Sequence, residues 1–304
     1  MPQFAYAPAS GLTLGSLAEG VLVALYGQTA QTDASGTLAE SVAADALALK
    51  VSADEAQDIS AGLVEIDTEL LRVASVDEDG TIHIHPRGRG VRGTLAAPHD
   101  AGAEVRTSPI VPYSSVIREI NAELRSIYPR ISSTCYTEFD ANSTDYVYAL
   151  PADAGLVLDV RWRDELGDWQ RVRGWEIEHG QNVDDFPSGI ALRIALRNTG
   201  KVRVIYGKPF GTLSALDATL ADAGIPDSLE DVIRTGVICR ILPTLDISRL
   251  SVSSTSSSEA NSRPPTPGTG VMVRRELKAE YRERLDAEVR TFRSYFPARP
   301  HITR

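Results

Sequence analysis

Apolar residues recur with a helical period in two segments of the first half of the chain. The segments 13–27 and 112–129 both place apolar side chains three or four positions apart, and this spacing predicts amphipathic helices. Ser114 or Ser115 is able to cap the second helix, and Pro129 is expected to end it. The stripes consist of Leu17, Val21 and Leu25 in the first helix and of Ile117, Ile120, Leu124 and Ile127 in the second.

Between these helices, short runs alternate apolar and polar residues, as half-buried strands do. The stretch DEDG (77–80) separates two of the runs and predicts a hairpin turn. We therefore expect a small helix and β-hairpin module that ends with the amphipathic helix and occupies residues 1–130. Its expected strands are 47–52, 63–67, 69–76, 81–85 and 104–109.

Residues 145–210 have an all-β pattern. The stretch RNTG (197–200) predicts a hairpin between the last two strands, and the turn 165–168 separates the first two. These strands predict a small antiparallel sandwich or barrel. The expected strands are 156–163, 169–178, 189–196 and 201–207.

The last third is predominantly helical. Ser228 and the acidic residues after it resemble a capping box, which opens a helix that Pro243 terminates. The stretch 251–270 is rich in Ser, Thr, Pro and Gly and predicts a flexible linker or extended arm. A long helix over 271–296 follows, with charged i, i+4 pairs on its polar faces. Its apolar stripe consists of Leu277, Tyr281, Leu285, Val289, Phe292 and Phe296.

Together these patterns predict an α+β protein. The small N-terminal module precedes a central antiparallel β-sandwich or barrel, and C-terminal helices with an extended arm complete the chain. The expected parts are residues 1–130, the β-domain 145–210, a helical segment 211–250, the linker 251–270 and the long helix with a basic tail, 271–304.

Composition and charge narrow the classes of function. The longest apolar runs fall short of the ~20 residues that span a bilayer, and the N-terminus lacks the pattern of a secretory signal, so we expect no membrane partner. Cys135 and Cys239 are far apart in sequence and are expected to be unpaired thiols of a protein assembled in a reducing cytoplasm. The net charge of −10 argues against general nucleic-acid binding. Residues 271–304 nevertheless carry +4, which suits docking on an acidic partner.

The glycine spacing G-x-G-x-x-G occurs at Gly88, Gly90 and Gly93. A dinucleotide site needs a helix directly after the third glycine, because the helix N-terminus carries the phosphate. Pro98 and Gly102 stand where that helix would run. We therefore interpret the stretch as a turn, although its three arginines, Arg87, Arg89 and Arg92, are able to hold a phosphate.

The histidines of the same region form a candidate metal site. His83 and His85 point to one face of a predicted strand, and His99 could approach them across a hairpin. No further acidic or histidine ligand completes a metal-binding spacing. We expect a polar strand face, with no metal and no cofactor.

Aromatic residues of the β-domain form another candidate site. Trp162, Trp169 and Trp175, together with Tyr146 and Tyr148, could stack on sugar rings, although Trp162 lies on the apolar face of its strand. No G-x-S-x-G or H-E-x-x-H motif and no isolated carboxylate pair occurs, so we expect no enzymatic activity.

Residues 64–105 resemble a signature of tailed-bacteriophage virion proteins. In that signature a strand pair with E-L-x-x-V leads to R-G-x-x-G-T-x-A-x-x-H-x-x-G-A-x-V. The order of pieces around it is similar to that of neck-region proteins of phages that infect actinobacteria. The matching positions are Glu69, Leu70, Val73, Arg89, Gly90, Gly93, Thr94, Ala96, His99, Gly102, Ala103 and Val105.

The resemblance implies a structural virion protein at the head–tail interface, assembled in the host cytoplasm. It would be a connector (adaptor) subunit that forms a ring, dodecameric by the family pattern, and contacts the portal protein, neighbouring copies of itself and downstream neck or tail proteins. DNA would pass through the ring without sequence-specific binding. The alternative is a tail or baseplate protein whose β-domain binds host-wall carbohydrate.

Within this hypothesis the glycine-rich stretch builds a rigid loop, and the C-terminal helix and tail dock on the portal. The loop glycines allow positive φ or close approach, Thr94 bonds back to a turn, and His99 fixes the loop by packing or hydrogen bonding. The expected loop residues are Gly90, Gly93, Thr94, His99 and Gly102. The expected partner-binding residues are Arg274, Arg275, Leu277, Tyr281, Leu285, Phe292, Tyr295, Phe296, Arg299 and Arg304.

Overall fold

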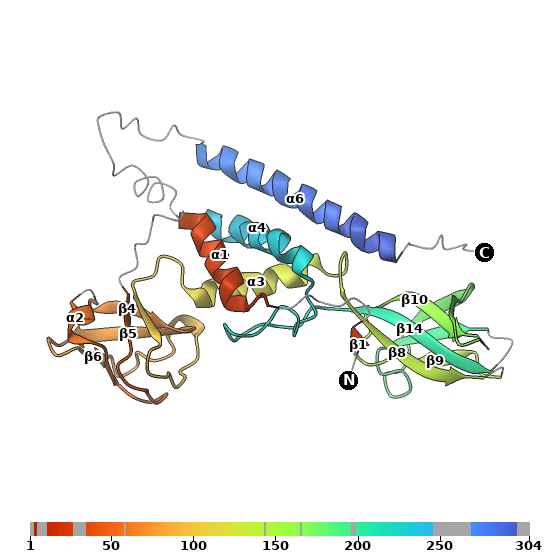
Figure 1. The fold of residues 1–304 in the computed structure, drawn as a ribbon, viewed down its shortest axis with the longest axis horizontal. Coiled ribbons are helices and arrows are strands. Elements are labelled where there is room, and N and C mark those ends of the chain that lie inside the picture. Colours follow the sequence, from red (N-terminus) through yellow and green to blue (C-terminus); the bar gives the residue numbers. More distant parts are fainter. Residues whose placement is uncertain are drawn as a thin grey trace.

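The computed structural model combines helices with antiparallel sheets, which confirms the predicted α+β class. A β-unit lies at each end of an elongated molecule, and helices lie between them (Figure 1). Within the described part of the chain, no helix is both long enough and apolar enough to cross a bilayer. The described residues are 3–4, 11–26, 35–57, 59–142, 144–164, 166–195, 199–245 and 269–296.

The first β-unit is a six-stranded antiparallel sheet in the order β2-β7-β4-β5-β6-β3. Its strands agree closely with the alternating runs in the sequence, because one face of each strand faces a common apolar core. The one-turn helix α2 (Ala53–Ala56) completes the unit. The strands are β2 (Ser35–Thr37), β3 (Ala48–Lys50), β4 (Gly62–Ile66), β5 (Glu69–Val76), β6 (Thr81–Ile84) and β7 (Glu104–Thr107).

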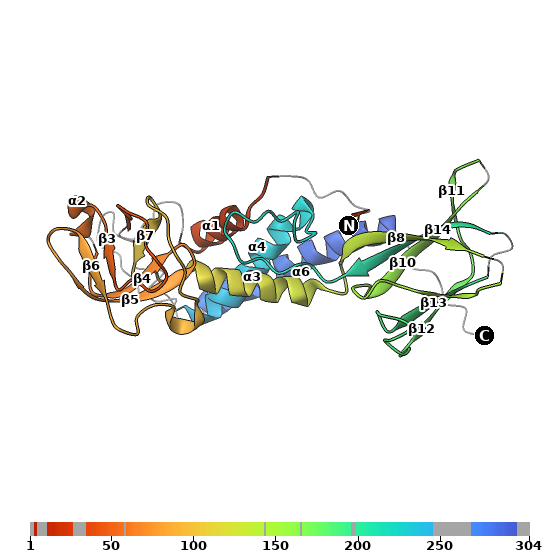
Figure 2. The same cartoon turned by 90° about the horizontal axis from the view of Figure 1, so that it is seen from below.

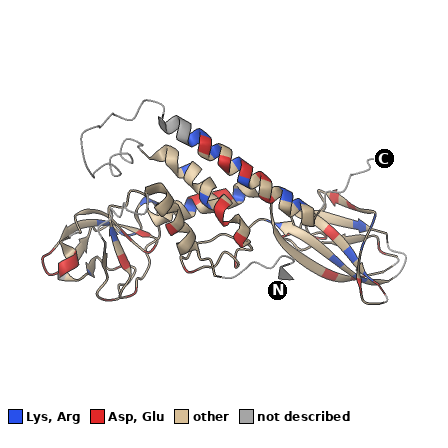
Figure 3. Ribbon diagram, turned by 45° about the horizontal axis from the view of Figure 1, so that its top comes forward, with Lys and Arg blue, Asp and Glu red and all other residues tan. Residues whose placement is uncertain are grey.

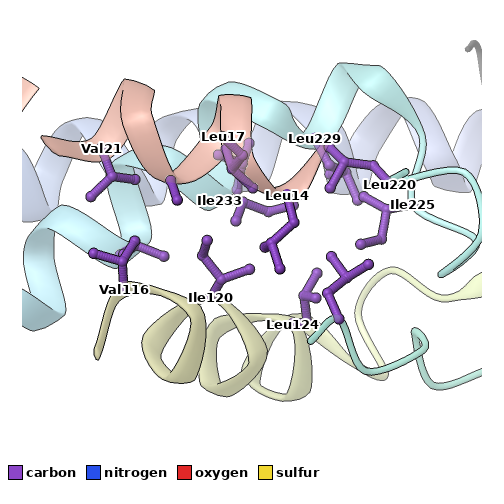
Figure 4. Close-up of a cluster of buried hydrophobic side chains, with 14 of the residues drawn as sticks. Leu14, Leu17, Val21, Val116, Ile120, Leu124, Leu220, Ile225, Leu229 and Ile233 are labelled. Atoms are coloured by element: carbon purple, nitrogen blue, oxygen red, sulfur yellow. The ribbon is translucent and has the colours of Figure 1, made fainter. Parts of the chain in front are cut away.

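The helical unit gathers segments that are far apart in sequence. Its helices are α1 (Leu14–Tyr26), α3 (Tyr113–Ile127), α4 (Glu230–Ile241) and α6 (Thr269–Tyr295). The predicted stripes of α1 and α3 face each other across an apolar core, to which the segment before α4 also contributes (Figure 4). The unit therefore closes only when the last third of the chain returns to the first.

The second β-unit has a five-stranded sheet in the order β1-β8-β14-β10-β11 and a three-stranded sheet in the order β12-β13-β9. Both sheets contribute to one apolar core, as the predicted sandwich requires. Cys135 and Cys239 are free thiols, as expected. The strands are β1 (Gln3–Phe4), β8 (Ser133–Ala141), β9 (Val147–Ala149), β10 (Leu156–Arg163), β11 (Trp169–Arg171), β12 (Trp175–His179), β13 (Ile190–Ile194) and β14 (Gly200–Lys208).

The pairing of these strands corrects two predictions. The run 169–178 is two strands in different sheets, since the chain turns between them at Gly174, whose φ is 84°. The predicted hairpin between β13 and β14 is wrong, because β13 pairs with β12 and β9 while β14 pairs with β10 and β8. Alternation marks a strand but does not choose its partner. The unit also begins earlier than expected, since β8 starts at Ser133.

The helix caps differ from the predicted ones. Pro112 is the N-cap of α3, and the amide of Ser114 donates to the Glu65 carboxylate of β4 at 3.2 Å, so a distant strand satisfies this helix end. The predicted capping box of α4 does not form. A 3-10 turn, Asp227–Leu229, leads directly into the helix, whose N-cap Leu229 has no side-chain capping bond.

Helix α6 lies along α4 of its own chain (Figures 1 and 2). Leu285 and Val289, from the predicted apolar stripe, are only 4% and 5% exposed. Of the charged i, i+4 pairs on α6, Glu280–Arg284 forms at 2.6 Å, whereas Asp286 contacts Arg130, just beyond the end of α3. The linker expected over 251–270 lies largely outside the described residues.

Two helix glycines give a matched test of this packing. A Cβ on Gly236 of α4 would lie 2.6 Å from Glu123 Cδ and 2.9 Å from Tyr281 Cε2, so Gly236→Ala pushes α3 and α6 away from α4. We expect this change to lower the free energy of unfolding by about 1–3 kcal/mol, measured by urea denaturation.

The control is Gly20→Ala in α1, where the nearest atom to the new Cβ is Arg234 Cδ at 3.6 Å. This change fits without displacement and should raise the free energy of unfolding by up to about 1 kcal/mol through helix propensity. Equal effects of the two substitutions would contradict the close approach of α6 to α4 at Gly236.

Candidate functional site

The residues of the sequence signature meet at a buried carboxylate. Glu69, the first residue of β5, is 1% exposed, and its two oxygens receive a bidentate ion pair from Arg89. Arg89 Nε lies 2.8 Å from Oε1 and Nη2 lies 2.8 Å from Oε2. This fork geometry is the strongest form of a charge-assisted hydrogen bond.

The same carboxylate holds the loop that follows β6. The amides of Gly90 and Ala97 donate to Glu69 at 2.9 and 3.0 Å. The Nη1 and Nη2 groups of Arg89 also donate hydrogen bonds to the carbonyls of Ala43, Ala46 and Ala97. The Arg89 side chain and the loop amides all bind Glu69, which belongs to β5. The cluster therefore fixes the loop against β5.

His99 completes the cluster. Its Nδ1 lies 2.7 Å from Asp67 Oδ2 and its Nε2 lies 2.9 Å from Glu69 Oε2. Burial alone would lower the pKa of His99, but Asp67 and Glu69 together raise this pKa to about 9. His99 is therefore a cation at neutral pH and donates from both ring nitrogens. The expectation that it fixes the loop by hydrogen bonding agrees with these contacts.

The pKa of Glu69 moves in the opposite direction. Burial would raise it, but hydrogen bonds from Arg89, His99 and the amides of Ala97 and Gly90 hold the pKa at about 2. The acid and the base of this cluster are thus both charged over the whole physiological range.

The glycine-rich stretch forms a turn, as predicted from Pro98 and Gly102. Gly90 and Gly93 have φ of 61° and 85°, and a short 3-10 turn takes the place of a phosphate-binding helix. Thr94 Oγ1 accepts from the amide of Leu70 at 3.0 Å and donates to Val91 O at 2.9 Å, which ties the turn to β5. Gly102, with φ of 85°, allows the next reversal.

The candidate metal ligands do not converge. His83 Nε2 lies 2.8 Å from Asp77 Oδ2 at the surface, and His85 is exposed, whereas His99 is buried with Asp67 and Glu69. Among the described residues, no three His, Cys, Asp or Glu side chains form a group that could hold a metal ion.

The tryptophans of the second β-unit do not form one aromatic platform. Trp162 and Trp175 pack against the core, and the Trp169 ring lies under the Arg203 guanidinium, 4.1 Å from its carbon. Tyr148 stacks on Phe139, with ring centroids 4.6 Å apart. The geometry therefore gives no specific support to the carbohydrate-binding alternative.

A second buried ion pair fastens the first β-unit to the helices. Arg106 Nη1 of β7 lies 3.0 Å from Glu65 Oε2, and both side chains are buried. The Arg106 guanidinium also lies 4.4 Å from the centre of the Tyr113 ring at the start of α3. Tyr113 in turn donates to Glu19 of α1 at 2.7 Å. One chain of contacts thus links the sheet to two helices.

A third buried carboxylate fastens α6. Glu123 of α3 is 2% exposed, accepts from Arg240 Nε of α4 at 2.6 Å, and accepts from the Tyr281 hydroxyl of α6. Burial and this contact raise the pKa of Tyr281. The three helices therefore meet at one acidic side chain.

Part of the expected partner-binding set packs against its own chain. Leu285 is buried in the helical core, and Tyr281 and Phe292 are half-buried against the same core. Arg275 and Tyr295 are exposed, while the other members within the described residues, Arg274, Leu277 and Phe296, are half-buried. Arg299 and Arg304 lie outside the described residues.

An apolar groove lies beside the exposed end of α6. It runs between the C-terminal turns of α6, the start of β8 and the segment before α4. Ile131, Pro226, Leu229, Phe292 and Tyr295 are among the residues that line it.

Glu65, Arg106 and Glu123 are not among the residues predicted from the sequence. The sequence signal that could have identified them is a charged residue that lies on the otherwise apolar face of a helix or strand. Glu123, for example, lies on the same helical face as Ile120 and Ile127. A buried charge needs a partner, but the sequence does not reveal which distant residue supplies it.

No family model and no curated protein matches the chain. Among solved structures it is similar to a chain of the structure described as "Neck of empty GTA particle computed with C6 symmetry". The identity is 14%, the match covers 55% of this chain and 79% of that one, and the TM-score is 0.20. A TM-score this low supports no assignment of fold or function.

The raised pKa of His99 predicts a pH-dependent stability. A group whose pKa rises from 6.5 unfolded to about 9 folded stabilises the protein fully below pH 6.5 and loses that contribution as pH rises through 9. We expect the wild-type free energy of unfolding to fall between these values by on the order of 3 kcal/mol more than that of His99→Gln. Urea denaturation across pH 6–9.5 measures this difference.

His83→Gln is the matched control, because the His83 side chain is 45% exposed and pairs with Asp77 at the surface. It should keep the wild-type slope. If His99→Gln and the wild type lose stability in parallel, the charged state of His99 is not what holds the loop.

Proposed function

We propose that the chain is a structural subunit of a tailed-phage particle, a connector that forms a ring at the junction of head and tail. The proposal begins from the resemblance of residues 64–105 to the virion signature and from what those residues do in the structure. We also propose that the chain has no enzymatic activity.

One observation carries the proposal. The charged signature residues Glu69, Arg89 and His99 are buried and bind one another and the loop backbone. Such groups are placed to hold a loop in one conformation and not to meet a substrate. Signature residues that keep a loop rigid are suited to a structural protein that acts by assembly with other subunits.

The arrangement of the units supports a ring. Buried contacts join the first β-unit to the helices, so subunits can present side surfaces of fixed relative position (Figure 2). Head-to-tail contacts between such surfaces close into a ring when the rotation closes, with twelve copies as the proposed number. The acidic body would let DNA slide through the channel without sequence-specific binding.

The portal contact is proposed on the exposed side of α6. Arg290 and Arg293 lie exposed near its C-terminal end, beside Tyr295, which is 52% exposed at the rim of the apolar groove. Figure 3 shows positions of Lys and Arg along α6, with Asp and Glu between them. A basic and aromatic surface of this kind suits an acidic partner surface. Downstream neck or tail proteins would contact the opposite end of the ring.

The double substitution Arg290→Glu/Arg293→Glu tests the portal contact. Both side chains are exposed, so the melting temperature should change by less than about 2 °C. We expect phage that carry it to accumulate unjoined heads and tails and to lose at least tenfold in infectious titre. Complementation of a deletion phage, followed by electron microscopy, measures both.

Arg118→Glu on α3 is the control, because this side chain is 68% exposed and far from the α6 end in sequence. It should leave joining unchanged. Antibody labelling of the whole chain on virions tests the location itself: label at the tail tip, or on no particle, would overturn the connector proposal.

A further inference from the structure

Two edges of the five-stranded sheet of the second β-unit have stretches that no described strand covers. On β8, the strand β1 pairs only with Cys135 and Tyr136, and no described strand pairs with the outer side of residues 137–141. At the opposite edge, no described strand pairs with the outer side of β11. Uncovered edges offer backbone donors and acceptors to another strand.

The two edges carry opposite charges on the same face of the sheet. Glu138 of β8 lies in register with Arg203, which is opposite Arg161, which is opposite Arg171 of β11. Asp140 follows Glu138 on that face and is exposed. At the β8 edge Glu138 pairs with Arg203 at 2.6 Å and Asp140 lies opposite Lys201. At the β11 edge Arg171 pairs with Asp159 at 3.0 Å and its side chain is still 45% exposed. The outermost charges are therefore acidic at one edge and basic at the other. Figure 3 shows residues of both signs on the second β-unit.

From these edges we propose that β11 of one copy adds to the free edge of β8 in the next copy, so that the sheet continues from subunit to subunit. The inference deepens the ring of the proposed function and rests on it. Arg171 of one copy would then lie beside Glu138 or Asp140 of the next. Opposite charges that face each other across strands favour pairing.

The direction of the strands agrees with this contact. The strands β8, β14, β10 and β11 alternate in direction, because each neighbouring pair is antiparallel. Four alternating strands leave β11 opposite in direction to β8. In a ring whose copies all point the same way along the axis, β11 therefore meets the next β8 in the antiparallel sense.

The lengths permit this contact. The stretch of β8 that no described strand covers, 137–141, has five residues and can accommodate the three residues of β11. A contact of this size is weak by itself, and it gains strength only when it is repeated around a closed ring.

A symmetric pairing of two β8 edges is disfavoured. Antiparallel pairing of residues 137–141 with their copies would set Glu138 and Asp140 against acidic residues of the second chain. Like charges directly opposite are destabilising. The complementary partner for the acidic edge is the basic edge of another copy.

Disulfide trapping tests the contact. The variant for this experiment carries Asp140→Cys and Arg171→Cys. It also carries Cys239→Ser, which removes a half-buried thiol. Within one chain β8 and β11 are separated by three strand spacings, about 14 Å, and this distance is too long for a disulfide. Mild oxidation should therefore give a reducible ladder of covalent dimers, trimers and larger species on a denaturing gel.

Asp140→Cys with Asp184→Cys is the matched control, since Asp184 is also exposed but lies between β12 and β13. It should give at least tenfold less multimer. If Arg171→Cys does not fold by circular dichroism, Arg173→Cys replaces it, because Arg173 is exposed two residues later.

Equal ladders for the two pairs, or no ladder for either, would overturn the edge contact. Labelling of virions decides the proposed function separately. A chain that labels the head–tail junction and gives no specific ladder is a connector that closes its ring through another surface.

Discussion

A carboxylate that leaves water must find a cation or hydrogen-bond donors where it is buried, and this constraint shapes the chain at three places. Glu69 gathers Arg89, His99 and two loop amides. Glu65 and Glu123 join elements that are distant in sequence. In each case the loss of one partner would leave a buried charge with fewer donors, so each carboxylate and its partners hold the surrounding elements together as a set.

These buried clusters show which residues are engaged in contacts within the chain. Exposed surfaces outside them are accessible to partners. The signature residues are occupied with the loop beside β5, and the apolar side of α6 is occupied with its own chain. Among the described residues, the surfaces that we propose for partners are the exposed C-terminal end of α6 and the two edges of the five-stranded sheet that no described strand covers. A protein of this construction presents surfaces at fixed relative positions, as a ring subunit must.

Local sequence predicted the loop and left open what the apolar stripe of α6 packs against. Pro98 and Gly102 exclude the phosphate-binding helix, and Gly90 and Gly93 occupy positive φ. The stripe of α6 was correctly identified as apolar. An apolar stripe does not reveal whether it packs against its own chain or against another one. Here Leu285 and Val289 are buried against their own chain. The carboxylate Glu123 shows the same limit, because its partners come from α4 and α6.

By itself the sequence determined the elements. The period of apolar residues placed α1 and α3, and alternation placed β5 and β10, because side-chain burial on one face is a local property of the chain. Only the tertiary structure decided which strands pair, why β13 and β14 part into different sheets, and how Glu65 comes to cap α3. Those choices depend on packing and charge compensation between residues that are far apart in sequence, and no local pattern records them.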